Sequence, residues 1–244
     1  MNRAITGFIA GIVMLLFSVG ADAAADTYVS YRGADTNGCT RVLPCRNVTK
    51  ALTVTDVNGT VHIIDSGEYR GFVVSVNASI VADPGITANI IGSGGNVVGV
   101  TGGDVTLKNL QVFNAFDGNG IAINNANVIV EDSSFFNNDN LFLKASDITI
   151  GGTGIVTIRR CYFNGGPNGQ NSGVEQNGGK VSVRDSEFNN YFKAITSQST
   201  VLVNHCIFTN NQTAISGSFA STGDNVFFNN VTDIVFNPSA ATVH

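Results

Sequence analysis

Two consecutive stretches decide the fold of this chain: residues 181–190 read VSVRDSEFNN and residues 201–210 read VLVNHCIFTN. Both fit one template, Val-x-Val-x-x-small-x-Phe-x-Asn. The template recurs upstream, and once downstream in degenerate form, at residues 105–114, 128–137, 156–165 and 221–230. Self-similarity with a period of about 20 to 28 residues is typical of repeat architectures.

Each repeat continues into a second apolar pair, such as Ala194-Ile195, so one unit holds three short strands that alternate apolar and polar residues. A single unit cannot bury its apolar side chains, whereas stacked units bury a continuous core. The sequence therefore predicts an all-β, single-domain parallel β-helix. This is a β-solenoid with three short strands per coil and coils about 4.8 Å apart.

The corners of the coils repeat as well. The position between the first two strands reads Asn109, Asp132, Arg160, Asp185, His205 and Asn225. The next corner reads Asn114, Asn137, Gly165, Asn190, Asn210 and Asn230. Asn, Asp and His are the non-glycine residues that most often adopt a positive φ, so we expect left-handed residues at the first of these corners.

The alignment also predicts two inward columns. One contains Cys161, Ser186, Cys206 and Val226, and the other contains Phe188, Phe208 and Phe228. Cys161 and Cys206 are two coils apart, about 9.6 Å, which exceeds the Cα separation of about 7 Å that a disulfide tolerates. We expect both to be free, buried thiols.

Composition excludes several classes of protein. The chain is 43% hydrophobic and 13% charged, with 28 glycines, a similar number of asparagines and a net charge of −5. A disordered chain would hold more charge and fewer apolar residues, and a long-helix protein would be rich in Ala, Glu, Lys and Leu. Because nucleic-acid binders are normally basic, we expect no nucleic-acid partner.

The first 23 residues have the pattern of a secretory signal peptide. Arg3 precedes an apolar run from Ile5 to Val19, and Ala21-Asp22-Ala23 fits a cleavage site. We therefore expect a secreted or periplasmic protein with no transmembrane segment once the leader is removed. Export permits disulfides, and Cys39 and Cys45, which share a short loop with Pro44, are the natural pair.

The opening of the mature chain carries a resemblance. It reads Tyr28-Val29-Ser30, Asp35-x-x-Gly38-Cys39 and Pro44-Cys45-Arg46, then an apolar strand from Val61 that ends in Asp65-Ser66-Gly67-Glu68-Tyr69. With the repeat, it resembles small secreted bacterial β-helix proteins of the pectin-lyase-like superfamily, a subfamily of undefined activity. The resemblance implies a right-handed coil, a cap helix over residues 47–54, a cap segment at 24–60 and a β-helix at 61–244.

The resemblance also says where sugars would bind: along the outer face of one sheet and its flanking loops. Active members use an Arg or Lys base, or closely spaced Asp residues that act as an acid and base pair. None of those motifs is present, so no catalytic residue is assigned, and we expect no metal and no cofactor. The third strand and the loops before it supply the ligand-binding candidates, which are Phe116, Asp117, Asp139, Glu175, Tyr191 and Lys193. The alternative reading makes these loops ordinary turns and insertions.

A second candidate set lies on one corner of successive coils: Asp132, Arg160, Asp185 and His205. Opposite charges at the coil spacing would form an ionic ladder. Exposed ion pairs of this kind stabilise a fold only weakly. The functional alternative is an anion or sugar site in which His205 carries a proton.

The leading functional hypothesis is a secreted, non-catalytic β-helix that binds glycans or a cell-envelope surface. One alternative is a polysaccharide lyase or glycosidase with an atypical site in the third-strand loops. Another is an adhesin-like or tail-spike-like module that acts as a trimer. The sequence leaves the oligomeric state open.

Overall fold

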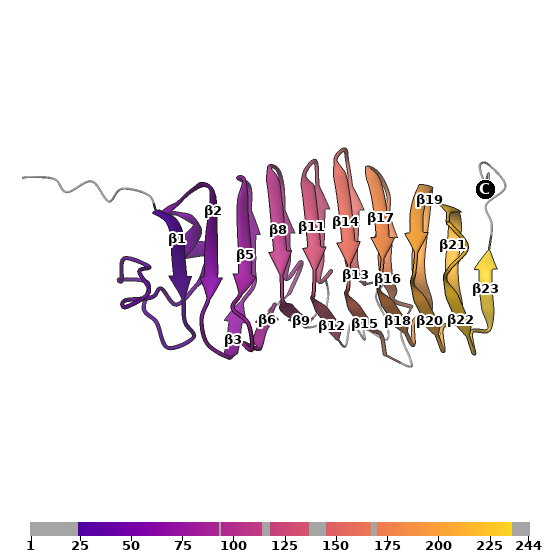
Figure 1. Ribbon diagram of the computed structural model, residues 1–244, viewed down its shortest axis with the longest axis horizontal. Helices are drawn as coiled ribbons and strands as arrows, with labels where there is room; N and C mark the ends of the chain where they lie inside the picture. Colours follow the sequence, from indigo (N-terminus) through magenta and orange to yellow (C-terminus); the bar gives the residue numbers. More distant parts are fainter. Residues whose placement is uncertain (1–23, 93, 114–117, 137–144, 167–169, 236–244) are drawn as a thin grey trace, which may run out of the picture.

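The computed structural model describes residues 24–92, 94–113, 118–136, 145–166 and 170–235, and these form a parallel β-solenoid of about seven turns (Figure 1). The predicted all-β, single-domain parallel β-helix is confirmed. Within the described residues the helix is short, α1 (Val48–Leu52), inside the predicted range of 47–54. No helix in this part of the chain is long and apolar enough to cross a membrane.

Each coil contributes a strand to each of three faces, and all strand pairs are parallel. The first face holds β2 (Thr55–Ile63), β5 (Ala78–Ala82), β8 (Asp104–Lys108), β11 (Asn127–Glu131), β14 (Ile155–Arg159) and β17 (Lys180–Arg184). The second face holds β3 (Gly67–Arg70), β6 (Ala88–Ile91), β9 (Leu110–Phe113), β12 (Ser134–Phe136), β15 (Tyr162–Asn164), β18 (Glu187–Asn189), β20 (Ile207–Thr209) and β22 (Val226–Phe228).

The third face returns the chain to the next coil. It holds β4 (Phe72–Val74), β7 (Val98–Val100), β10 (Ile121–Asn124), β13 (Ser146–Gly151), β16 (Ser172–Gln176) and β23 (Thr232–Val235). The long strands β19 (Lys193–Asn204) and β21 (Thr213–Ala220) run from this face into the first face of the following coil. At the N-terminal end, β1 (Ala24–Val29) pairs with β2. The first corner joins the first face to the second, and the second corner joins the second face to the third. The third corner returns the chain to the first face of the next coil.

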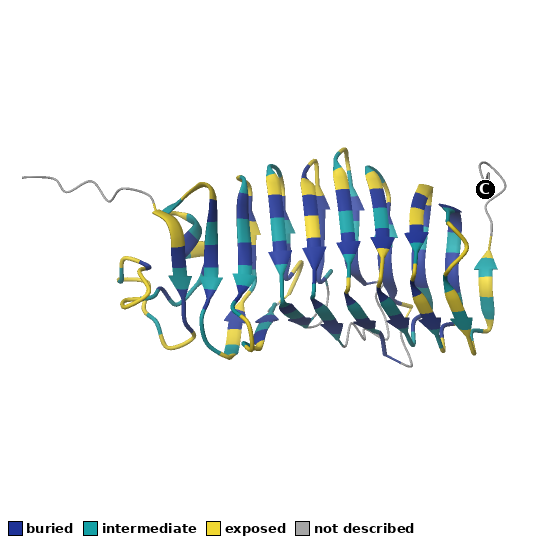
Figure 2. Cartoon of the chain, viewed as in Figure 1, coloured by how far each residue is buried: buried dark blue, intermediate teal, exposed yellow. Residues whose placement is uncertain are grey.

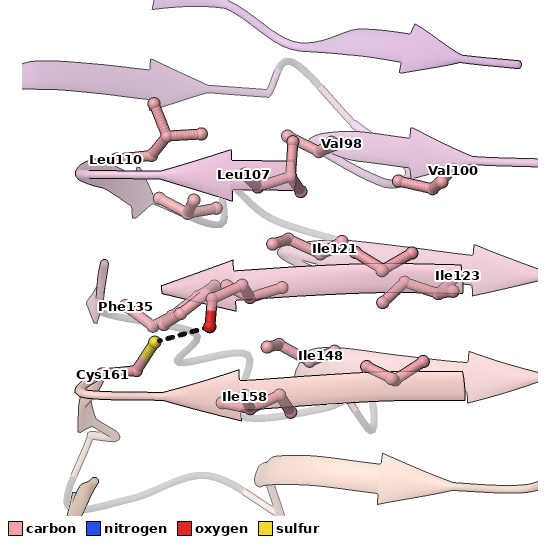
Figure 3. Close-up of a cluster of buried hydrophobic side chains, with 14 of the residues drawn as sticks. Val98, Val100, Leu107, Leu110, Ile121, Ile123, Phe135, Ile148, Ile158 and Cys161 are labelled. Atoms are coloured by element: carbon pink, nitrogen blue, oxygen red, sulfur yellow. Dashed lines mark hydrogen bonds between the residues drawn. The ribbon is translucent and has the colours of Figure 1, made fainter. Parts of the chain in front are cut away.

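The core is a set of columns that run along the solenoid. Buried and exposed residues alternate along the strands of the first face (Figure 2). Figure 3 shows Leu107 and Ile121 of one coil, and Ile158 two coils further on, pointing into one interior space. An aromatic column continues it, with centroids 4.4 to 5.2 Å apart, through Phe135, Phe163, Phe188, Phe208 and Phe227.

The last coil departs from the predicted register. Phe208 pairs with Phe227 and Ile207 with Val226, so the final repeat is one residue shorter than the template assumed. The predicted inward positions of Phe228 and Val226 are therefore wrong, since these side chains are 68% and 53% exposed. Asn225 occupies the cysteine column instead, and its side chain accepts a hydrogen bond from the Cys206 backbone N–H at 2.9 Å.

The expected left-handed first corners are present except at Asn225, where the prediction is wrong because the shorter last repeat moves this residue out of the corner. Backbone φ lies between 51° and 57° at Asn109, Asp132, Arg160, Asp185 and His205. At the second corner φ is positive at Asn190, Asn210 and Asn229. Asn229 replaces the expected Asn230 because of the shorter last repeat, Gly165 has no positive φ, and Asn114 and Asn137 lie outside the described residues.

The cysteines are arranged as predicted. Cys39 and Cys45 form a disulfide with their Cα atoms 4.6 Å apart. Cys161 and Cys206 are free and buried. The Cys161 thiol donates to the Val130 carbonyl at 3.6 Å, the dashed line in Figure 3.

Candidate functional site

The third face presents the outward column that the repeat predicts. Strand register aligns Ala122, Thr149, Glu175, Thr196 and Ser216 on successive coils. Glu175 is partly buried, and its Oε2 accepts a hydrogen bond from Ser146 Oγ at 2.8 Å. Three of the predicted ligand-binding residues, Phe116, Asp117 and Asp139, lie outside the described residues.

Tyr191 and Lys193 lie at the second corner but differ in access. The Tyr191 side chain is only 2% exposed, so its ring contributes no open surface. Lys193 is partly exposed, and its Nζ lies 5.8 Å from the centroid of the Phe192 ring. The accessible aromatic at this corner is therefore Phe192.

Beside Phe192 is a hollow of about 280 Å³ that we call the amide groove. Its walls come from the second corner of the last four coils and consist largely of carboxamide side chains. The lining residues are Gly166, Asn190, Tyr191, Phe192, Asn210, Asn211, Gln212, Asn229 and Val231. The sequence named Tyr191 as a candidate at this corner. The Asn residues that recur at the second corner were the pattern that could have indicated the carboxamide side chains.

The amides hold one another in register along the solenoid axis. Asn229 Nδ2 donates to Asn210 Oδ1 at 2.6 Å, and Asn210 Nδ2 donates to Asn189 Oδ1 at 2.9 Å. Gln212 and Asn229 are exposed. Because a carboxamide both donates and accepts hydrogen bonds, a ladder of this kind keeps further donors and acceptors for a bound molecule.

A buried acid lies behind the groove. Asp147 is fully buried, its Oδ2 is hydrogen-bonded to the Tyr191 hydroxyl, and its Oδ1 has no hydrogen-bond partner. Burial raises the pKa of Asp147 well above its ordinary value, against the opposing effect of the Tyr191 hydroxyl. The raised pKa favours the neutral form of the carboxyl, and its burial places it out of reach of a ligand at the surface.

The first corner carries a charged network centred on Glu131. Its carboxylate lies 3.0 Å from Lys108, 2.5 Å from Arg159 and 3.0 Å from Arg160. Burial alone would raise the pKa of Glu131, but hydrogen bonds from Lys108 and Arg159 outweigh it and lower that pKa. The sequence reading missed Glu131, although the aligned column Lys108, Glu131, Arg159 and Arg184 alternates in charge at its start.

The predicted ladder exists in two separate parts. Arg160 Nε lies 2.7 Å from Asp132 Oδ1, as expected, and hydrogen bonding to Arg160 is the main cause that lowers the pKa of Asp132. Arg160 does not come within 4.0 Å of Asp185. That carboxylate faces Arg184 at 3.6 Å and His205 at 4.0 Å instead.

A hollow of about 610 Å³ lies over this break in the ladder, lined in part by Arg160, Tyr162, Asp185 and His205. His205 Nε2 lies 3.0 Å from Asp224 Oδ2. The charges around the hollow are mostly paired with one another, so the arrangement stabilises stacked coils and leaves little uncompensated charge for a ligand. Across the described ranges no three His, Cys, Asp or Glu side chains are placed to hold a metal ion.

Comparison with protein families shows which family this chain resembles. The family model described as adenovirus EB1 55K protein / large t-antigen matches residues 70–235. This range begins at the last residue of β3 and ends with β23, so it covers the solenoid from β4 onward and leaves out the cap, β2 and most of β3. No curated protein matches the chain. The pectin-lyase-like resemblance stays a prediction.

Proposed function

The chain belongs to the family described as adenovirus EB1 55K protein / large t-antigen, and from the geometry of its solenoid we propose a non-catalytic protein whose amide groove binds a neutral glycan. The family description names neither a ligand nor a reaction, so the proposal rests on the groove itself. The observation that carries it is the pairing of one accessible aromatic ring, Phe192, with a ladder of carboxamides.

The chemistry of the groove suits sugar hydroxyls. Hydroxyl groups donate and accept hydrogen bonds, and the carboxamides of Asn190, Asn210, Gln212 and Asn229 do the same. The partly exposed ring of Phe192 offers an apolar surface beside them. A volume of 280 Å³ is just below the range of about 300–1,000 Å³ for small-ligand sites, so we expect weak binding of one or two sugar units.

The absence of an acid and base pair at the groove supports binding without turnover. None of the residues that line the groove carries a carboxylate or an imidazole. Glycosidases with paired carboxylates hold them about 5–9.5 Å apart on either side of the scissile bond. The acid that is hydrogen-bonded to Tyr191, Asp147, is buried, and burial raises its pKa, which leaves it unsuited to that chemistry.

Export is part of the same proposal. The pattern of residues 1–23 is that of a signal peptide, and the Cys39–Cys45 disulfide fits an oxidising compartment. We infer a secreted or periplasmic location, where glycans of a cell envelope or matrix are the available partners. The opening motif of the mature chain supports, as part of this proposal, the resemblance to bacterial β-helix proteins of the pectin-lyase-like superfamily.

The test is an NMR titration of the isotope-labelled mature chain with neutral oligosaccharides. We expect saturable shifts of the side-chain amides of Asn210, Gln212 and Asn229, and at least a tenfold loss of affinity in Phe192→Ala. Phe113→Ala is the matched control, because Phe113 is a partly exposed phenylalanine several coils away that stacks on Phe136. Equal binding by both variants, or no saturable shift with any neutral oligosaccharide, would overturn the proposal.

A further inference from the structure

The second corner also carries a hollow at its N-terminal end, about four coils from the amide groove. It has a volume of about 790 Å³ and lies where the cap meets the turns after β3 and β6. Two guanidinium groups reach it from different segments, Arg46 from the cap and Arg70 from β3, and Glu68 lines the same hollow. It is independent of the amide groove in both position and charge.

Arg46 is held in place by three contacts that leave part of its guanidinium uncommitted. Its backbone N–H donates to Asp35 Oδ1 at 2.9 Å, and its Nη2 donates to the Glu68 carbonyl at 3.2 Å. The guanidinium carbon lies 5.8 Å from the centroid of the Tyr69 ring. Its Nη1, by contrast, is buried and has no hydrogen-bond partner.

A buried donor on a charged group without a partner is costly and calls for an explanation. Arg46 cannot easily swing away to solvate it, because Tyr69 and the Glu68 carbonyl fix its plane. The guanidinium is therefore held in one orientation at the wall of the hollow, where the partly exposed side of Arg46 can meet an acceptor.

Arg70 supplies the second positive charge. Its side chain is exposed on the outer side of β3, beside the same hollow. Within the described residues, no carboxylate lies within 4.0 Å of the guanidinium of Arg46 or Arg70, whereas Arg159, Arg160 and Arg184 of the first corner all have such a partner. Glu68 is the carboxylate that lines the hollow with these two cations, so the hollow has an excess of positive charge in a chain whose net charge is −5.

We propose that Arg46 and Arg70 form a binding site for one oxyanion group, a carboxylate or a sulfate, carried on a small ligand. Guanidinium groups recognise such groups through parallel, charge-assisted N–H donors. With two cations and the Glu68 carboxylate around the hollow, the formal charge of the site is +1, which matches a single anionic group. The volume leaves room for the molecule that carries it.

The experiment is an NMR titration of the Arg side-chain Nε–Hε signals of the full mature chain at constant ionic strength. The probes are sodium sulfate, sodium acetate, sodium glucuronate and, as a neutral control, glucose. We expect saturable shifts of Arg46 and Arg70 with the anions and none with glucose. A response to acetate and glucuronate identifies a carboxylate site, and a response to sulfate alone identifies an inorganic oxyanion site.

Variants separate a built site from general screening of charge. Arg70→Gln, an exposed substitution that keeps the fold, should weaken anion binding at least tenfold, and Glu68→Gln should tighten it severalfold. Arg184→Gln, in the charged first corner, is the matched control and should leave affinity unchanged. Equal, non-saturating responses in Arg70→Gln and Arg184→Gln would overturn the site. Because Phe192 is untouched in these variants, the outcome is independent of neutral glycan binding at the amide groove.

Discussion

The ring of Phe227 stacks on the ring of Phe208, with centroids 5.2 Å apart and planes within 10° of each other. This contact sets the register of the last complete coil. It places Phe227 at the end of the aromatic column and turns Phe228, the next residue, outward to 68% exposure. The two adjacent phenylalanines can therefore be compared by substitution, since one faces the core and the other faces outward.

Phe227→Ala should lower the free energy of unfolding by about 1–3 kcal/mol, less than the 3–5 kcal/mol typical of a fully buried phenylalanine, because Phe227 is only partly buried. Phe228→Ala should change it by no more than about 0.5 kcal/mol. Urea denaturation and amide exchange in β20 and β22 measure both. The opposite ranking would mean that Phe228, not Phe227, lies in the column.

Glu131→Gln should destabilise the protein at pH 7 by about 1–3 kcal/mol, since it removes charged hydrogen bonds to Lys108 and Arg159. Asp185→Asn is the control, because Asp185 is more exposed and its partners lie 3.6 and 4.0 Å away. The lowered pKa of Glu131 gives stability that is present above pH 4.5 and lost as the pH falls through the folded-state pKa. The difference in free energy of unfolding between the wild type and Glu131→Gln, measured by urea denaturation, should therefore disappear in acid. A difference that stays constant down to pH 2 would contradict this role.

Asp147 should have the opposite pH dependence. Its pKa is raised in the folded state by burial, so above pH 3.8 the unfolded chain loses a proton that the folded chain keeps. Stability then falls by about 1.4 kcal/mol for each pH unit until the folded-state pKa is reached. The free energy of unfolding of Asp147→Asn, measured by urea denaturation, should therefore rise relative to that of the wild type between pH 4 and 7. A difference that does not vary with pH would show that Asp147 is ionised in the fold.

The two free thiols should be unreactive in the native protein. Burial is the main cause that raises the pKa of both Cys161 and Cys206 to about 12, and the thiolate is the reactive form. Alkylation followed by mass spectrometry should modify neither thiol in the folded chain and both after denaturation. Rapid native labelling of either one would contradict its place in the core.

The repeat predicted the coil, the corner residues before the last coil and the burial of Cys161 and Cys206, because each follows from alignment of one unit on the next. The Cys39–Cys45 disulfide followed instead from the short loop that the two residues share. It failed at the last coil, where the template is degenerate and a deletion of one residue reverses which of Phe227 and Phe228 faces inward. The same alignment could have identified Glu131, which lies one position before the first-corner residue of its coil.

Other features depend on contacts that no periodicity contains. Asp147 is the second residue of β13, just after a corner, where the first three residues of the strand are all buried and do not alternate. Its burial could therefore not be predicted from the sequence pattern. Arg46 belongs to the cap, outside the repeat, and meets Arg70 only because the cap folds over the first coils. Tertiary packing, not sequence spacing, creates that pair.

The most direct test of the central claim is to incubate the mature chain with neutral glycans and uronates and to analyse both the bound and the released sugars by chromatography. The structure predicts saturable retention of a neutral glycan, recovered at its original length, and loss of that retention in Phe192→Ala. Release of shortened or unsaturated products in proportion to the amount of protein would contradict a non-catalytic binding role.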